Sequence, residues 1–237
     1  MKNKLSLAVL LCAIAASAPV FAATYTSLTL PTLNTDIRTY TDGGVYDPLF
    51  TGPVTPHVLG STPFDLQLSA SGNDAFIGGS GGGAITIPVN VYGVDNVDTL
   101  INSGWGTAGV TTGSITFNGS VSSYTVDLVE GSNVRDHYYG NYVNTTSAPY
   151  VMEAVWGVNS PGNAHLDMQN FILPSIFSTQ MLDSITFDSF GLGNPDGTPF
   201  IVGATAVSGV ATTPLPASGL LMLSALALTG VAALRRR

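Results

Sequence analysis

The stretch Ile85-Thr86-Ile87-Pro88-Val89-Asn90-Val91 alternates β-branched apolar residues with Thr, Pro and Asn. Successive side chains of a strand point to opposite faces, so this pattern predicts a strand with one buried face. Pro88 has no N–H to donate to a neighbouring strand. The strand should therefore lie at a sheet edge or carry a bulge.

Similar patterns recur along the chain. Period-two alternation marks 115–117, 121–129 and 185–189, and 200–210 is a longer run of β-branched and small residues. Gly, Asn, Asp or Pro bounds each segment, at the short spacing typical of sandwiches. We therefore predict an all-β fold in which residues 23–213 form a single β-sandwich domain.

One segment predicts a short helix instead. Asp95 or Asn96 can cap it, and Val97, Leu100 and Ile101 follow the i, i+3, i+4 spacing of one helix face before Gly104. A second short turn is expected at 176–181. The Gly-rich stretch 69–83 should be a surface loop, although residues 78–82 have the Gly-x-Ser-x-Gly form of a nucleophile elbow.

The charges are distributed unevenly. The chain has 7 basic and 15 acidic residues, and between the two ends only Arg38 and Arg135 are basic. Without a basic patch to neutralise phosphates, the sequence argues against nucleic-acid partners. Its single cysteine, Cys12, lies near the N-terminus, so the body needs no disulfide or thiol chemistry.

The N-terminus has the form of a secretory signal peptide. Lys2 and Lys4 precede the apolar run 5–16, and Val20-Phe21-Ala22 supplies a cleavage site after Ala22. We expect export through the Sec machinery and removal of residues 1–22 by signal peptidase.

The C-terminus has three parts in order. Pro214-Leu215-Pro216-Ala217 precedes the apolar run 215–234, and the chain ends in Arg235-Arg236-Arg237. At about 1.5 Å per residue this run matches the roughly 30 Å hydrocarbon core, and the arginines place the tail on the cytoplasmic side. We therefore predict a transmembrane helix with the body outside.

This tail (214–237) resembles the PEP-CTERM sorting signal of Gram-negative bacteria, with Leu215 where the usual glutamate stands. The resemblance implies recognition by an exosortase, cleavage near the box, and passage from an inner-membrane intermediate to the outer surface or an exopolysaccharide-rich matrix. It implies nothing about the chemistry of the body.

The body is also similar to PEP-CTERM surface proteins of unassigned function. The similarity rests on Val94 to Gly106 (VDNVDTLINSGWG), on Val134-Arg135-Asp136-His137 and on Leu166-Asp167-Met168-Gln169. The general layout resembles galactose-binding-like jelly rolls, which implies a β-sandwich. It carries no known ligand or catalytic residue onto this chain.

The strongest candidate binding feature is the loop 135–142, which concentrates Arg135, Asp136, His137 and Tyr138. One interpretation is a carbohydrate site, in which Arg135 pairs with a carboxylate such as a uronic acid of an exopolysaccharide. The other is that Arg135 pairs with an acid of the same domain and holds the loop. Trp105 and Trp156 are candidate sugar platforms or packing residues.

Metal and catalytic sites have weaker signals. His57, His137 and His165 lack ligand spacing, so we assign no metal site to them. Ca²⁺ binding is possible at 194–197 or 42–44, although both first resemble β-turns. We predict no catalytic residue and no other cofactor. The sequence thus favours an exported, non-catalytic surface or matrix protein that associates with exopolysaccharide. The alternatives are a secreted polysaccharide- or peptide-active hydrolase and a structural or adhesive subunit without a small ligand.

Overall fold

The computed structural model describes residues 22–37, 57–59, 62–138, 142–156 and 164–209. The predicted signal segment up to residue 21 and the whole predicted sorting tail, Pro214 to Arg237, lie outside these residues, as do the candidate turn 42–44 and Arg38. Within the described ranges, none of the helical structure is long and apolar enough to cross a membrane.

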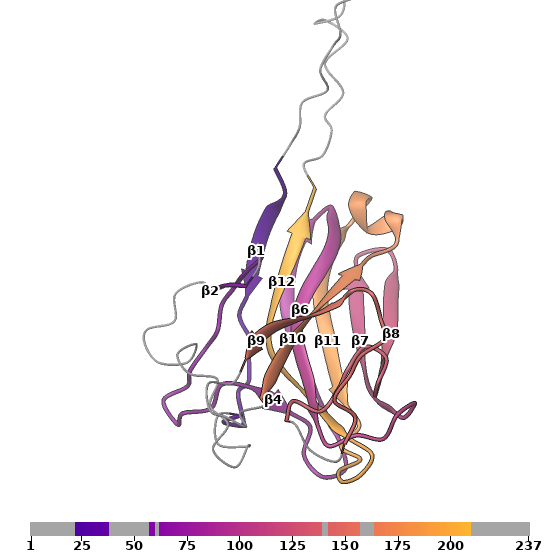
Figure 1. Ribbon diagram of the computed structural model, residues 1–237. Coiled ribbons are helices and arrows are strands. Elements are labelled where there is room, and N and C mark those ends of the chain that lie inside the picture. Colours follow the sequence, from indigo (N-terminus) through magenta and orange to yellow (C-terminus); the bar gives the residue numbers. More distant parts are fainter. Residues whose placement is uncertain (1–21, 38–56, 60–61, 139–141, 157–163, 210–237) are drawn as a thin grey trace, which may run out of the picture.

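The prediction of an all-β fold is confirmed: two antiparallel sheets pack face to face (Figure 1). The larger sheet has the order β1 (Thr24–Leu28), β12 (Thr198–Ser208), β6 (Val94–Gly104), β10 (His165–Ile172) and β9 (Val151–Trp156), and β4 (Phe76–Ile77) also pairs with β12. The smaller sheet has the order β5 (Gly83–Tyr92), β11 (Met181–Ser189), β7 (Thr111–Gly119) and β8 (Ser123–Val129). A short hairpin joins β2 (His57–Leu59) to β3 (Thr62–Phe64).

The main core lies between the two sheets, and β5 contributes to it as its alternation predicts. Ile85, Ile87 and Val89 are buried, while the residues between them are exposed. Pro88 is on the edge strand of its sheet, opposite Ser184, where the register with β11 shifts. Both expectations for Pro88 are therefore confirmed.

The predicted helix after Asp95 is wrong, because residues 94–104 form strand β6. Val97 and Ile101 belong to the core between the sheets, but Leu100 belongs to a second apolar cluster with Phe64 and Val202. The strand is thus buried on both faces, and its adjacent apolar residues point in opposite directions. A strand covered on both sides loses the alternation that would have identified it.

Of the other two local predictions, one is confirmed and one holds only in part. The turn expected at 176–181 is a short 3-10 helix, η1 (Ser175–Thr179). The Gly-rich stretch 69–83 is exposed or half-buried loop at 69–73 and 79–82, but residues 74–78 are buried and contain strand β4, so the surface-loop prediction is wrong for that part. Ser80 therefore lies in a loop and not at the strand-to-helix turn that a nucleophile elbow requires.

The strand register gives the sandwich two distinct ends. Thr24 of β1 pairs with Ser208 of β12, so both ends of the sandwich leave it side by side, at the top of Figure 1. At the other end of β12, Thr198 pairs with Gly104 of β6. The loops after β6 and before β12 are therefore at the end opposite the paired ends.

The burial of β6 on both faces can be tested with two neighbouring truncations. We expect Leu100→Ala and Ile101→Ala each to lower the free energy of unfolding by about 2–5 kcal/mol, because each removes fully buried methyl groups. Ile172→Ala, at a side chain that is 74% exposed, is the control and should cost far less. Urea denaturation measures all three. A small loss for either Leu100→Ala or Ile101→Ala would contradict the two-sided packing.

Candidate functional site

Strands β6 and β10 separate near one end, and side-chain amides bridge the gap. Their ladder runs from Ile172–Asn96 to Met168–Leu100. Beyond Leu100, the Gln169 amide accepts a hydrogen bond from Ile101 N at 3.1 Å and donates to Ile101 O at 2.7 Å. The Asn102 side chain likewise accepts from Asp167 N at 2.8 Å. Two side chains thus replace the backbone partners that the diverging strands have lost.

The segment 134–138 inserts into this gap and forms isolated β-bridges, from Asp136 to Ser103 of β6 and from Tyr138 to Ala164, which directly precedes β10. Ser103 N donates to Arg135 O at 2.9 Å, and His137 N donates to Ser103 O at 2.8 Å. On the other side, His165 N donates to His137 O at 2.6 Å. The segment is therefore held by backbone hydrogen bonds to both β6 and β10.

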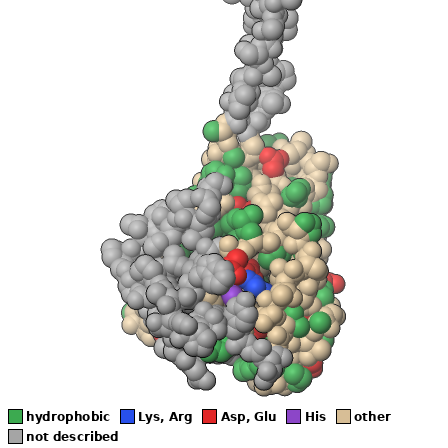
Figure 2. Space-filling model, in the orientation of Figure 1, with side chains coloured by type: hydrophobic (Ala, Val, Ile, Leu, Met, Phe, Trp, Pro, Cys, Tyr) green, Lys and Arg blue, Asp and Glu red, His purple; other side chains and the backbone are tan. Residues whose placement is uncertain are grey.

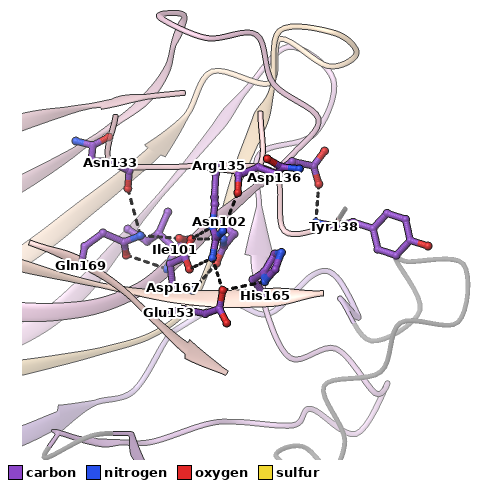
Figure 3. Close-up of polar contacts among 11 residues, drawn as sticks. Ile101, Asn102, Asn133, Arg135, Asp136, Tyr138, Glu153, His165, Asp167 and Gln169 are labelled. Carbon is purple, nitrogen blue, oxygen red and sulfur yellow. Dashed lines mark hydrogen bonds and ion pairs between the residues drawn. The ribbon is translucent and has the colours of Figure 1, made fainter. Parts of the chain in front are cut away.

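Arg135 forms the centre of the polar cluster in the gap (Figure 3). Its Nε and Nη2 donate to the two carboxylate oxygens of Asp167, both at 2.7 Å. Nη2 also donates to Glu153 Oε2 at 2.7 Å, and Nη1 donates to Asn144 O at 2.7 Å. The side chain is only 11% exposed. Of the two interpretations of Arg135, the internal ion pair is the one that these contacts describe.

The cluster places one guanidinium between two carboxylates. Burial works to lower the pKa of Arg135, but the hydrogen bonds and charges of Asp167 and Glu153 outweigh it and raise that pKa. Figure 2 shows blue, red and purple side chains gathered at one place on this face. Two carboxylates around one guanidinium form a network of charge-assisted hydrogen bonds.

Two of the three candidate histidines lie next to each other here. Burial lowers the pKa of His137 to about 3, with a further contribution from His165, and the His137 ring packs edge-on against Phe200 at 5.0 Å. Burial and the charge of Arg135 also lower the pKa of His165, whose Nδ1 lies 3.1 Å from Glu153 Oε2. Both imidazoles are thus neutral at pH 7. The side chain of His57 lies outside the described residues.

Asp136 links the inserted segment to Trp105. Its Oδ1 accepts a hydrogen bond from Tyr138 N at 2.7 Å, and its carboxylate also accepts from the backbone N–H of Trp105. Burial raises the pKa of Asp136 to about 6, although these two hydrogen bonds oppose the rise. The half-buried Tyr138 ring points away from the cluster in Figure 3.

Trp105 is half-buried and lines a pocket of about 300 Å³ at the end of the sandwich. The other lining residues come from the end of β4, from two loops and from the start of β12: Ile77, Gly78, Gly79, Ser80, Gly191, Leu192, Gly193, Asn194 and Thr198. Of the five sequence-predicted ligand residues, Trp105 faces this pocket, whereas Arg135, Asp136 and His137 contribute to the network that holds its loop. The side chain of Trp156 lies outside the described residues.

Glu130 is a functional candidate that the sequence did not indicate. It is buried, and a Cβ added to either Gly106 or Gly197 would collide with its carboxyl group. Neither oxygen makes a hydrogen bond of good geometry with another described residue. Burial raises the pKa of Glu130 to about 8, and Asp136 adds to the rise against the hydroxyls of Ser103 and Thr112. Glu130 is therefore mostly protonated at pH 7. Its carboxyl group lies between residues 105–110, which we call the Trp105 loop, and the 191–197 loop.

Across the described residues, no three His, Cys, Asp or Glu side chains are grouped so that they could hold a metal ion. The candidate Ca²⁺ loop 194–197 is a turn, closed by a hydrogen bond from Gly197 N to Gly193 O at 2.8 Å. Calcium binding there stays a prediction.

No family model matches this chain, and no curated protein sequence matches it either.

The first site prediction concerns the ion pair. Asp167→Asn leaves the buried guanidinium of Arg135 without its bidentate partner, so we expect a loss of about 3–5 kcal/mol in the free energy of unfolding. Asp183→Asn, on an exposed position of β11, is the matched control and should change it by less than about 0.5 kcal/mol. Urea denaturation at pH 7 measures both. Equal, small effects would show that the pair does not stabilise the fold.

The free energy of unfolding should depend on pH through Glu130. Because folding raises the pKa of Glu130 from 4.5 to about 8, the folded protein keeps a proton that the unfolded chain releases over that range. The free energy of unfolding should therefore fall as pH rises from 4.5 to 8, by up to about 1.4 kcal/mol per pH unit. Between pH 6.5 and 8, above the pKa of Asp136, Glu130→Gln should flatten this slope.

The control for this experiment is Asp127→Asn, at an exposed position of β8. Its slope should equal that of the wild type. Parallel curves for the wild type and Glu130→Gln would mean that Glu130 is already ionised in the folded protein.

Proposed function

We propose that this chain is an exported, non-catalytic cell-surface or matrix protein that is sorted by an exosortase and associates with exopolysaccharide. In this proposal the described sandwich is a jelly roll of the galactose-binding-like type. The observation that carries it is the side-by-side exit of both ends of the sandwich. Thr24 pairs with Ser208, close to the predicted cleavage site at Ala22 and to the predicted box at Pro214.

This arrangement supports a domain that is attached at one end only. With the apolar run 215–234 in a membrane, the paired ends would face that membrane and the opposite loops would point away from it. After cleavage near the box, the same end would carry the exosortase attachment. The domain can therefore present the same loops before and after sorting.

The candidate reactive groups support a binding protein over a hydrolase. Asp136 accepts hydrogen bonds from two backbone amides, and His137 is a buried, neutral ring against Phe200. Arg135 and Asp167 are paired with each other. These side chains have structural partners, while the Trp105 pocket is lined by uncharged residues.

Processing can be tested by the intact mass of the surface-exposed form. We expect a protein that lacks residues 1–22 and the apolar run with its arginines, and that is retained by the organism's own exopolysaccharide in a pull-down. Replacing Arg235, Arg236 and Arg237 with Ala should leave the tail uncut, whereas Leu215→Glu, which restores the usual box, should be cut normally. A mature wild-type protein that still ends in Arg237 would exclude exosortase sorting. Failure to retain the polysaccharide would exclude the association.

A further inference from the structure

We propose that the Trp105 pocket binds one or two uncharged sugar units of a polysaccharide, with the indole as the stacking surface. This inference rests on the proposed function, which it deepens by naming the site and the class of sugar. It is carried by the place of the pocket in the fold, the backbone at Trp105 and the chemistry of the lining.

The pocket lies at the end of the sandwich opposite Thr24 and Ser208. Strand β6 runs from Val94, which pairs with Ser208, to Gly104, which pairs with Thr198, and Trp105 follows directly. At about 3.3 Å per residue, the strand carries Trp105 roughly 30 Å from the paired ends. A chain attached through those ends would present the pocket outward.

The backbone at Trp105 is held in an unfavourable conformation. Its φ angle is 65°, in the left-handed region that bulky side chains rarely adopt. The Asp136 carboxylate accepts the hydrogen bond from Trp105 N–H, and the Arg135 pairs hold the segment that carries Asp136. Such strain persists only where the surroundings fix it, and it is concentrated at ligand sites. Here it orients a large aromatic side chain at a pocket.

The lining offers what a neutral sugar requires. A sugar ring has an apolar C–H face and hydroxyl groups that both donate and accept hydrogen bonds. Trp105 supplies an aromatic surface, and Ser80, Asn194 and Thr198 supply hydroxyl and amide groups. Asn194 is also oriented, since its Nδ2 donates to the Tyr142 hydroxyl at 2.7 Å. At about 300 Å³ the pocket is at the lower end of small-molecule sites, which limits it to one or two units.

The charges disfavour an acidic sugar. None of the described lining residues is charged. Arg135, the one Lys or Arg side chain in the described ranges, donates to Asp167, Glu153 and Asn144. The chain as a whole carries a net charge of −8. A uronic acid carboxylate would therefore meet repulsion without a cation to offset it.

Tryptophan fluorescence provides a direct test, because the chain has 2 tryptophans, Trp105 and Trp156. The full-length protein in detergent would be titrated with glucose, galactose and mannose hexasaccharides and with an oligogalacturonate. We expect at least one neutral hexasaccharide to change the emission, in the wild type and equally in Trp156→Phe. Trp105→Ala should weaken binding at least tenfold, as measured by calorimetry.

A second variant blocks the pocket without touching the indole. A Cβ at Gly79 would meet nothing within 4 Å and the residue has no left-handed φ, so Gly79→Leu should fold normally and fill the pocket. We expect it to weaken binding at least tenfold. The control is Val121→Leu, which is 76% exposed in the β7–β8 turn at the other end of the sandwich and should bind like the wild type. Thermal unfolding checks that each variant is folded.

The outcomes separate this inference from the proposed function. If the wild type retains the organism's polysaccharide but folded Gly79→Leu and Trp105→Ala do so equally well, the pocket is not the site, while the association stands. Binding of the oligogalacturonate alone would overturn the neutral class. If no hexasaccharide binds, the inference fails whatever the pull-down shows.

Discussion

The bidentate ion pair between Arg135 and Asp167 is the interaction on which this end of the sandwich depends. Strands β6 and β10 separate beyond Leu100, and a gap inside a sheet exposes backbone groups that must find partners. The inserted segment 134–138 supplies them, and it brings Arg135 into contact with Asp167 and Glu153. Removing a charged pair from water is costly, so a pair in this position is stable only because four guanidinium hydrogen bonds are made at once.

The effect of that pair extends to the pocket through covalent and hydrogen-bonded neighbours. Fixing Arg135 fixes Asp136, and Asp136 accepts the hydrogen bond from the strained Trp105 backbone. The network that was a candidate ligand site is therefore better described as the support of one. Its residues hold the backbone of Trp105 in place, and the uncharged pocket that Trp105 lines is the proposed ligand site.

Sequence patterns predicted the parts of this architecture that depend on local periodicity. The β5 segment has one buried and one exposed face, so its side chains alternate and its strand was identified. Strand β6 is covered on both sides, so Leu100 and Ile101 are adjacent apolar residues that imitate a helix face. The partners of Arg135 come from two other strands, and no local pattern could choose Asp167 and Glu153 from 15 acidic residues. Glu130 carries no signal at all, because its role depends on glycines far away in the sequence.

Glu130 makes the stability of this end of the sandwich depend on pH. Gly106 and Gly197 leave room for its carboxyl group, which touches the Trp105 loop on one side and the 191–197 loop on the other. A protonated carboxyl can pack there, since it avoids the desolvation of a charge. Once ionised, it would be an uncompensated charge beside Asp136, and the repulsion would act on the two loops that form the pocket. Glu130 and Arg135 thus both act on the loop that carries Trp105. Arg135 acts through Asp136 by way of paired charges, and Glu130 acts through a carboxyl group whose charge folding suppresses.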